Sequence, residues 1–104
     1  MRVFKPKDPG ESIPFSLDFT ADLLTGETLA TISSVTLTLL SGTTDPNMSL
    51  ILGGAAQISG NEVVQLITSG MSGNRYALTA LCTTSASRTL AQGGIITITP
   101  AALQ

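Results

Sequence analysis

Apolar and polar residues alternate strictly in the first periodic segment of the chain, residues 12–19. A period of two puts alternate side chains on opposite faces of a strand, so this segment is predicted to be a strand with one buried face. Pro14 has no N–H to donate, which places the strand at a sheet edge or starts its pairing after Pro14. The apolar positions are Ile13, Phe15, Leu17 and Phe19.

Further segments of the same kind follow. In residues 29–40, apolar residues alternate with Ser and Thr from Val35 onward, and no stripe with a helical period competes. Residues 57–58 and 63–67 flank Ser-Gly-Asn-Glu, which favours the tight turn of a hairpin. The other expected strands are residues 48–52, residues 76–82, and residues 88–90 with 95–99, either one strand or a pair, where Gly93-Gly94 could mark a bulge.

The spacing of these segments predicts the fold class. About seven short strands, with turn signals at roughly 8–12-residue intervals, indicate an all-β, antiparallel immunoglobulin-like β-sandwich. A small closed barrel is the alternative. Residues 12–104 are expected to form this single domain, because a chain of 104 residues has room for one core.

The first 11 residues differ from the rest of the chain. They hold two prolines and a glycine, and proline pushes the residue before it into an extended conformation. Residues 1–11 are therefore predicted to be an extended arm, with a frayed terminus as the alternative.

Composition narrows the possible functions. Only 12% of the residues are charged, the net charge is −2, and 15 Thr and 11 Ser make up a quarter of the 104 residues. Without histidine the chain lacks the commonest general base and metal ligand, and one cysteine permits neither an intrachain disulfide nor a cysteine-based zinc site. Five basic residues make a poor footprint for nucleic acid. No segment resembles a signal peptide or is long enough to span a membrane.

Candidate chemistry is sparse. Asp18 and Asp22 are close enough in sequence to be weighed as a pair of catalytic carboxylates, but carboxylates on a polar strand face and in loops explain them as well. Asp45-Pro46-Asn47 is the nearest approach to a calcium loop and lacks the rest of the pattern. Cys82 lies on the apolar side of its strand and is predicted to be a buried, inert thiol. We therefore expect no catalytic residue, no cofactor and no metal.

Three residues around the strand at residues 76–82 carry alternative interpretations. Tyr76 could bury its ring as ordinary core, or also hydrogen-bond backbone through its hydroxyl at a sandwich corner. Arg75 and Arg88 lie near the two ends of this strand. They are either solvated or paired with a carboxylate of a partner protein.

Four motifs follow one another in order over nearly the whole chain. They are Lys7-Asp8-Pro9, residues 18–29, residues 73–79, and residues 83–88 followed by Ile96-Thr97-Ile98. With these motifs the chain resembles small bacteriophage virion proteins described as fibre-tail adaptor proteins. It departs from the family pattern at Val35, where a tryptophan is frequent, and at Ser87, where a glycine often precedes the arginine.

The resemblance implies a non-enzymatic structural subunit in the tail or neck of a virion, made in the host cytoplasm and not secreted. Its partners would be tail, neck, portal or fibre proteins, contacted by several copies around a symmetric axis, with no nucleic acid and no membrane. A head decoration or spike domain, or a receptor- or carbohydrate-binding module, is the alternative. The residues expected to contact partner proteins are Lys5, Lys7, Asp8, Pro9 and Glu11 of the arm, together with Arg75 and Arg88.

Overall fold

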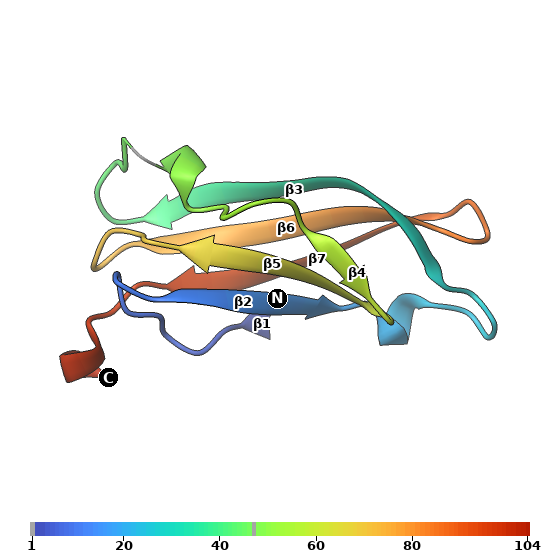
Figure 1. Ribbon diagram of the computed structural model, residues 1–104, viewed down its shortest axis with the longest axis horizontal. Helices are drawn as coiled ribbons and strands as arrows, with labels where there is room; N and C mark the ends of the chain where they lie inside the picture. Colours follow the sequence, from blue (N-terminus) through green and yellow to red (C-terminus); the bar gives the residue numbers. More distant parts are fainter. Residues whose placement is uncertain (1, 47) are drawn as a thin grey trace.

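The computed structural model describes residues 2–46 and 48–104, and it consists of two facing β-sheets (Figure 1). One sheet has the strand order β1-β7-β6-β3 and the other β2-β5-β4. The predicted all-β class with about seven strands is therefore confirmed. Residue 1 of the predicted arm and residue 47 of the turn before residue 48 lie outside the described residues. The strands are β1 Arg2–Val3, β2 Ser12–Asp18, β3 Leu29–Ser41, β4 Gln57–Ser59, β5 Glu62–Thr68, β6 Arg75–Thr84 and β7 Thr89–Thr97.

Loops connect the strands of the two sheets, and single turns of 3₁₀ helix lie in the β2–β3 and β3–β4 connections and after β7. Among the described residues, every strand pair is antiparallel except β1 with β7, which is parallel. An immunoglobulin-like sandwich requires three strands in CFG order facing strands in BED order. The orders β3-β6-β7 and β2-β5-β4 meet that requirement, and the immunoglobulin-like classification itself stays a prediction. The 3₁₀ helices are η1 Thr20–Asp22, η2 Met48–Leu50 and η3 Ala101–Leu103.

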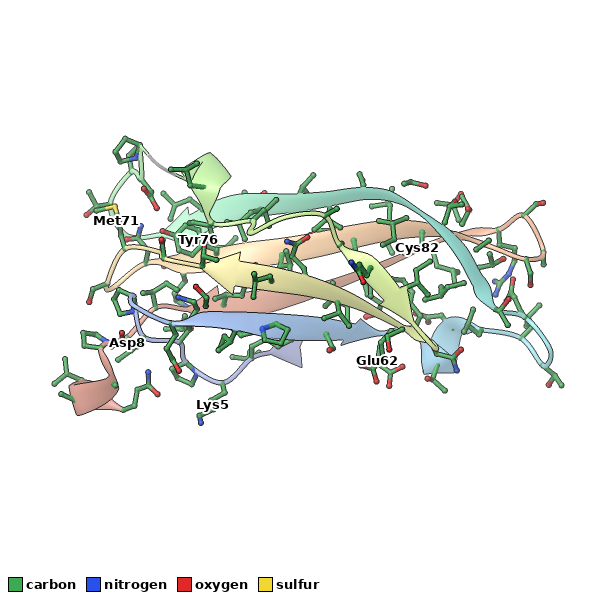
Figure 2. The ribbon with its side chains drawn as sticks, in the orientation of Figure 1. Lys5, Asp8, Glu62, Met71, Tyr76 and Cys82 are labelled. Carbon is green, nitrogen blue, oxygen red and sulfur yellow. The ribbon has the colours of Figure 1, made fainter. Side chains whose placement is uncertain are left out.

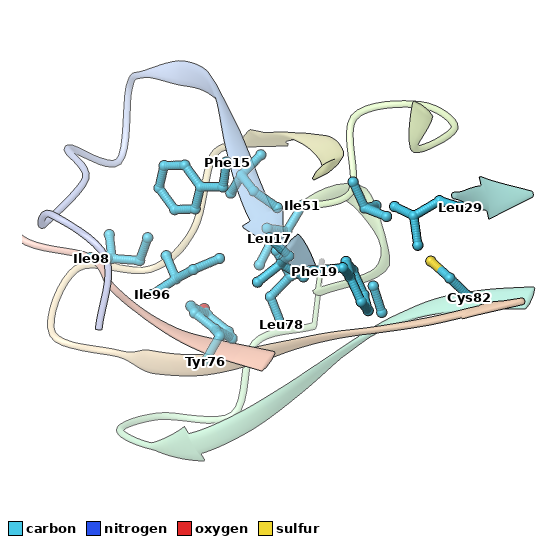
Figure 3. Close-up of a cluster of buried hydrophobic side chains, with 13 residues drawn as sticks. Phe15, Leu17, Phe19, Leu29, Ile51, Tyr76, Leu78, Cys82, Ile96 and Ile98 are labelled. Atoms are coloured by element: carbon cyan, nitrogen blue, oxygen red, sulfur yellow. The ribbon is translucent and has the colours of Figure 1, made fainter. Parts of the chain in front are cut away.

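The core fills the space between the sheets (Figure 3). The alternation predicted for residues 12–19 is confirmed, since Phe15, Leu17 and Phe19 are buried. β2 also lies at the edge of its sheet, as Pro14 predicted, because an edge strand has no ladder on its open side for a proline to interrupt. Cys82 is also buried, and burial raises the pKa of its thiol. The other buried apolar residues include Ile51, Val63, Ile67, Tyr76, Leu78, Ile96 and Ile98.

The prediction of a strand at residues 48–52 was wrong. Residues 48–50 form η2, in which the N–H of Ile51 donates to the carbonyl of Met48 at 3.2 Å. This turn directs Ile51 into the core at 1% exposure and leaves Leu50 65% exposed. A continuous apolar run has no period, so the sequence did not distinguish a strand from a helical turn that buries one residue.

The last strand contains no bulge. β7 runs unbroken through Gly93-Gly94, with a continuous register against β6 from Thr89 to Thr97. Gly94 is instead a position of close packing, because an added Cβ would lie 2.9 Å from Cζ of Phe4. The glycine therefore makes room for an aromatic ring that reaches β7 from the beginning of the chain.

The segment predicted to be an arm lies along β7. The N–H of Phe4 donates to the carbonyl of Ile95 at 2.9 Å, and the Phe4 ring packs on Phe15 with centroids 4.8 Å apart. Further along, Lys7 and Ile98 form a parallel bridge. The arm thus adds to one edge of the four-stranded sheet and covers the core next to β2.

Tyr76 satisfies both interpretations offered for it. Its ring is fully buried, and its hydroxyl donates to Oδ2 of Asp45 at 3.0 Å and accepts from Nδ2 of Asn74 at 3.1 Å and from the N–H of Met71 at 3.3 Å. Asn74 also donates to the carbonyl of Thr43 at 2.7 Å and accepts from its N–H at 2.8 Å. Gly42, at a φ of 111°, has no space for a side chain, because a Cβ would lie 2.7 Å from Cγ of Asn74. This network closes one end of the sandwich.

Candidate interaction surface

The structure separates the predicted contact residues into two groups at opposite ends of a molecule that measures 44 × 25 × 20 Å. Arg75 begins β6 and pairs with Thr97, whose carbonyl accepts from the N–H of Lys7, so both lie at one end. Arg88 lies in the β6–β7 hairpin, at the other end (Figure 1). We name the first the arm end, defined by residues 5–11, Arg75 and residues 97–103.

Lys7 is buried rather than presented to solvent. Its exposed fraction is 0%, and its ammonium donates to the carbonyl of Ser69 at 2.6 Å and to that of Asp8 at 2.8 Å. Burial lowers the pKa of Lys7, while the carboxylates of Glu11 and Asp8 partly offset this effect. Lys7 therefore fastens the arm to the β5–β6 loop, and it is not available for a partner in this conformation.

Asp8 organises the turn that follows Lys7. Its Oδ2 accepts from the N–H of Gly10 at 2.7 Å, and its Oδ1 accepts from the N–H of Ala101 at 2.8 Å in η3. The N–H of Asp8 donates to Oε1 of Glu11 at 2.8 Å. The hydrogen bond from Ala101, followed by that from Gly10, lowers the pKa of Asp8. These hydrogen bonds of Asp8 therefore hold the turn against the C-terminal segment.

The remaining charged groups of the arm end face outward. Lys5, Glu11 and Arg75 are exposed, and Pro9 is half-buried at the tip of the turn. Figure 2 shows the Lys5 side chain pointing away from the body of the molecule. The structure therefore brings Lys5, Pro9, Glu11 and Arg75 to one end as groups that a partner can reach.

Arg88 has its carboxylate within the same chain. Nε donates to Oε2 of Glu27 at 2.9 Å, Nη2 donates to Oε1 of the same residue, and Nη2 also donates to the carbonyl of Asp22 at 2.8 Å. Thr84 donates a further hydrogen bond to Oε2 of Glu27, whose side chain is 3% exposed. We name Arg88, Glu27, Thr84 and Asp22 the clamp; it fixes the β2–β3 connection to the β6–β7 hairpin.

The clamp predicts a loss of stability in acid. The Arg88 guanidinium, helped by the N–H of Leu24 and the hydroxyl of Thr84, lowers the pKa of Glu27 from 4.5 to about 2. Because the folded pKa lies below the unfolded one, the stability is present above pH 4.5 and is lost as pH falls toward 2. We expect the Tm to fall through this window, and Glu27→Gln to lower the Tm at pH 7 and to flatten the fall.

Some acid dependence will persist in Glu27→Gln because the pKa of Asp8 is also lowered. Glu62→Gln removes a carboxylate from the β4–β5 turn and serves as the matched control. An equal fall of Tm in Glu27→Gln and in the parent chain would show that the clamp does not couple folding to protonation.

The outer face of the four-stranded sheet is nearly free of charge. On the positions of β3, β6 and β7 that share this face, Arg75 at one end is the single charged residue. Threonine and small residues fill most of the rest, together with the half-buried Ile95 and with Leu81, which is 36% exposed. Such a face costs less to desolvate than one covered with Lys or Glu.

A shallow groove lies on the outer face of the other sheet. It has a volume of about 550 Å³ and is lined between Pro14 of β2 and Ile58 of β4 by uncharged residues. Next to the groove, Gln65 of β5 donates to the carbonyl of Gly54 at 3.0 Å, which ties the segment before β4 to β5. The composition of the lining suits contact with another protein surface better than it suits a charged ligand.

The described residues were compared with the requirements of a metal site. Within residues 2–46 and 48–104, no three side chains of the metal-ligating types His, Cys, Asp and Glu come together in a possible ion site. Asp18 accepts from the N–H and hydroxyl of Thr20, at 2.8 and 2.6 Å, which places its carboxylate in a turn. A search of the described helices for a membrane-spanning segment also found none.

Sequence reasoning missed Glu27, Asn74 and Asp45 as organising residues. Each acts on a residue that is distant in sequence: Glu27 on Arg88, Asp45 on Tyr76, and Asn74 on Thr43. The one signal available was the position of Tyr76 immediately after a glycine- and asparagine-containing loop.

Comparison with known proteins shows the family to which the chain belongs. A search of curated proteins and a search of solved structures gave no match. Residues 7–97 match the model of a family described as podophage GP4 fiber-tail adaptor protein gp77. The match begins at Lys7 in the anchored turn and ends at the last residue of β7, so it takes in all of both sheets except β1. The chain therefore belongs to the podophage fibre-tail adaptor family, whose members are structural proteins of the phage tail.

Proposed function

We propose that this chain connects a fibre or spike to the tail of the virion, in several copies around the particle axis, and that it docks through its arm end. The observation that carries the proposal is the grouping of Lys5, Pro9, Glu11 and Arg75 at the end of the molecule where hydrogen bonds of Asp8 hold the turn. An anchored turn loses little conformational entropy on binding, so its exposed charges are already placed for a partner.

The alternative of a carbohydrate-binding module has less support. Sugar sites use exposed aromatic rings as stacking platforms. Of the four aromatic residues, Phe15, Phe19 and Tyr76 are buried in the core, and Phe4 packs against it. A head decoration domain would use the same kinds of surface, and the family described for the tail favours the adaptor role.

The docking proposal is tested with charge reversal rather than with deletion of the arm. Removing residues 1–10 would also remove Phe4 and Lys7, which pack and bond within the fold. We expect the double variant Lys5→Glu with Arg75→Glu to fold normally and to enter particles several-fold less than the parent chain. Incorporation is measured by quantifying the chain, and the attached fibres, in purified particles.

Glu62→Lys is the matched control, because it changes charge at the β4–β5 turn, far from Lys5 along the molecule (Figure 2). It should leave incorporation unchanged. Normal incorporation and normal fibre attachment by the double variant would exclude the arm end as the docking surface.

A further inference from the structure

The edge formed by β3 is long, and it is unprotected between the register shifts that lie near its two ends. β3 has 13 residues and is the outermost strand of its sheet, and among the described strands it pairs with β6 alone. Soluble proteins usually protect such edges with charged side chains, proline or bulges. Leu29–Ser41 contains no charged residue and no proline, and its pairing with β6 is regular from Ser34 to Leu39. The middle of this edge is therefore open to another strand.

The inner side of β3 is also incompletely covered. Val35, Leu37 and Leu39 lie opposite Ala80, Leu78 and Tyr76 in the register with β6. The three β6 residues are fully buried, whereas the three β3 residues are only half-buried. The reason is that the facing sheet ends in β4, which has only 3 residues. A row of apolar side chains is left at the rim of the core.

We propose that the β3 edge pairs antiparallel with β3 of a second copy of this chain, around a two-fold axis at Leu37. The sequence from residue 35 to residue 39 has residues of the same kind at equal distances on either side of Leu37. In this register Leu37 meets its own counterpart, Val35 meets Leu39 of the second copy, and Thr36 meets Thr38 of the second copy. Apolar residues then lie opposite apolar residues on the inner face, and threonines lie opposite threonines on the outer face.

Charge and symmetry favour a second copy as the occupant. Because Leu29–Ser41 is uncharged, two copies bring no like charges together and bury no unpaired charge. A shift of one residue in the register would turn the apolar residues of one copy to the outer face of the shared sheet. The alternation in both copies therefore favours registers in which the two apolar rows lie on the same inner face. An isologous contact of this kind is closed, since each copy uses its only β3 edge. The two half-buried rows complete one shared core.

The experiment places charges on the exposed residues Thr36 and Thr38, which would face each other across the axis. The parent chain is expected to be a dimer by light scattering and sedimentation at micromolar concentration. In Thr36→Lys with Thr38→Lys, two symmetric pairs of lysines would oppose one another. We expect the dissociation constant of the dimer to rise about ten-fold or more.

The complementary variants test the register. Thr36→Lys with Thr38→Glu places each lysine opposite a glutamate of the second copy, so the dimer should persist. Mixing the double-lysine variant with a double-glutamate variant, Thr36→Glu with Thr38→Glu, should restore dimers containing one of each. All three variants carry two charges on the same exposed positions, so a difference between them does not arise from folding of the monomer.

Thr89→Lys with Ala91→Lys is the matched control, because both positions are exposed on β7 and share the outer face but not the β3 edge. It should leave the dimer intact. A parent chain that stays monomeric, or a dimer that survives the double-lysine change at β3, would overturn the proposal. Dissociation of the control variant would assign the contact to the sheet face. If the lysine–glutamate variant weakened the dimer as much as the double-lysine variant, the proposed register would be rejected. Either result also overturns the proposal.

Discussion

Replacing Tyr76 with phenylalanine is expected to lower the free energy of unfolding by about 1–3 kcal/mol, the usual cost of leaving buried hydrogen-bonding partners unsatisfied. The hydroxyl accepts from Asn74 and Met71 and donates to Asp45, and the ring around it is fully buried. Without the hydroxyl, the amide of Asn74 and the carboxylate of Asp45 each lose a partner. Urea unfolding measured at one pH gives the difference.

Replacing Tyr76 with alanine extends the comparison, because it removes the ring as well. We expect a loss of about 3–5 kcal/mol, as for other buried aromatic residues. Thr89→Val is the control: it removes a hydroxyl from an exposed position of β7 and should change the stability by less than about 0.5 kcal/mol. If the phenylalanine variant were as stable as the parent chain, ring burial alone would account for Tyr76, and the corner network would contribute nothing.

The strands with alternating residues could be predicted because their burial is a local property. In β2 and β3 a period of two determines which side chains face the core, whatever the rest of the chain does. The hairpin of β4 and β5 was predictable for a similar reason, since Ser59-Gly60-Asn61-Glu62 supplies a turn between two short apolar segments. Residues 48–52 carry no period, and there the prediction was wrong.

The candidate site was only partly predictable because its geometry depends on long-range contacts. Lys7 in a segment of charges and prolines has the sequence of a solvated residue, and its burial depends on the carbonyl of Ser69, 62 residues away. Arg88 pairs with Glu27 across 61 residues. Local sequence identified both residues as notable, but it could not show that their partners lie within the chain.

The structure shows which surfaces of the chain lack charged residues. On the outer face formed by β3, β6 and β7, Arg75 is the one charged residue, and the β3 edge carries none. The charges that remain are concentrated in the turn at the arm end, in the clamp and in connecting loops. Faces of this composition cost little to desolvate in a protein contact, and membership of an adaptor family implies contact with other phage tail proteins.

Gly94→Ala is expected to release the arm from β7. The added methyl group would lie 2.9 Å from Cζ of Phe4, whose ring also packs on Phe15 with the centroids 4.8 Å apart. Overpacking of this kind costs about 1–3 kcal/mol. Since the bond after Lys5 precedes a proline and resists trypsin, cleavage after Lys7 reports release of the arm, and its rate should rise about ten-fold.

A double-mutant cycle with Phe4→Ala shows whether the ring is the cause. Phe4→Ala alone should also speed cleavage after Lys7, because it removes the packing on Phe15. With the ring absent, however, the three atoms nearest to the methyl group at residue 94 are gone, so adding Gly94→Ala to Phe4→Ala should change the rate little. If Gly94→Ala had the same effect in both backgrounds, the glycine would be needed for the conformation of β7 itself, and the arm would owe its position to Lys7 and Asp8 rather than to the close approach of Phe4 and Gly94.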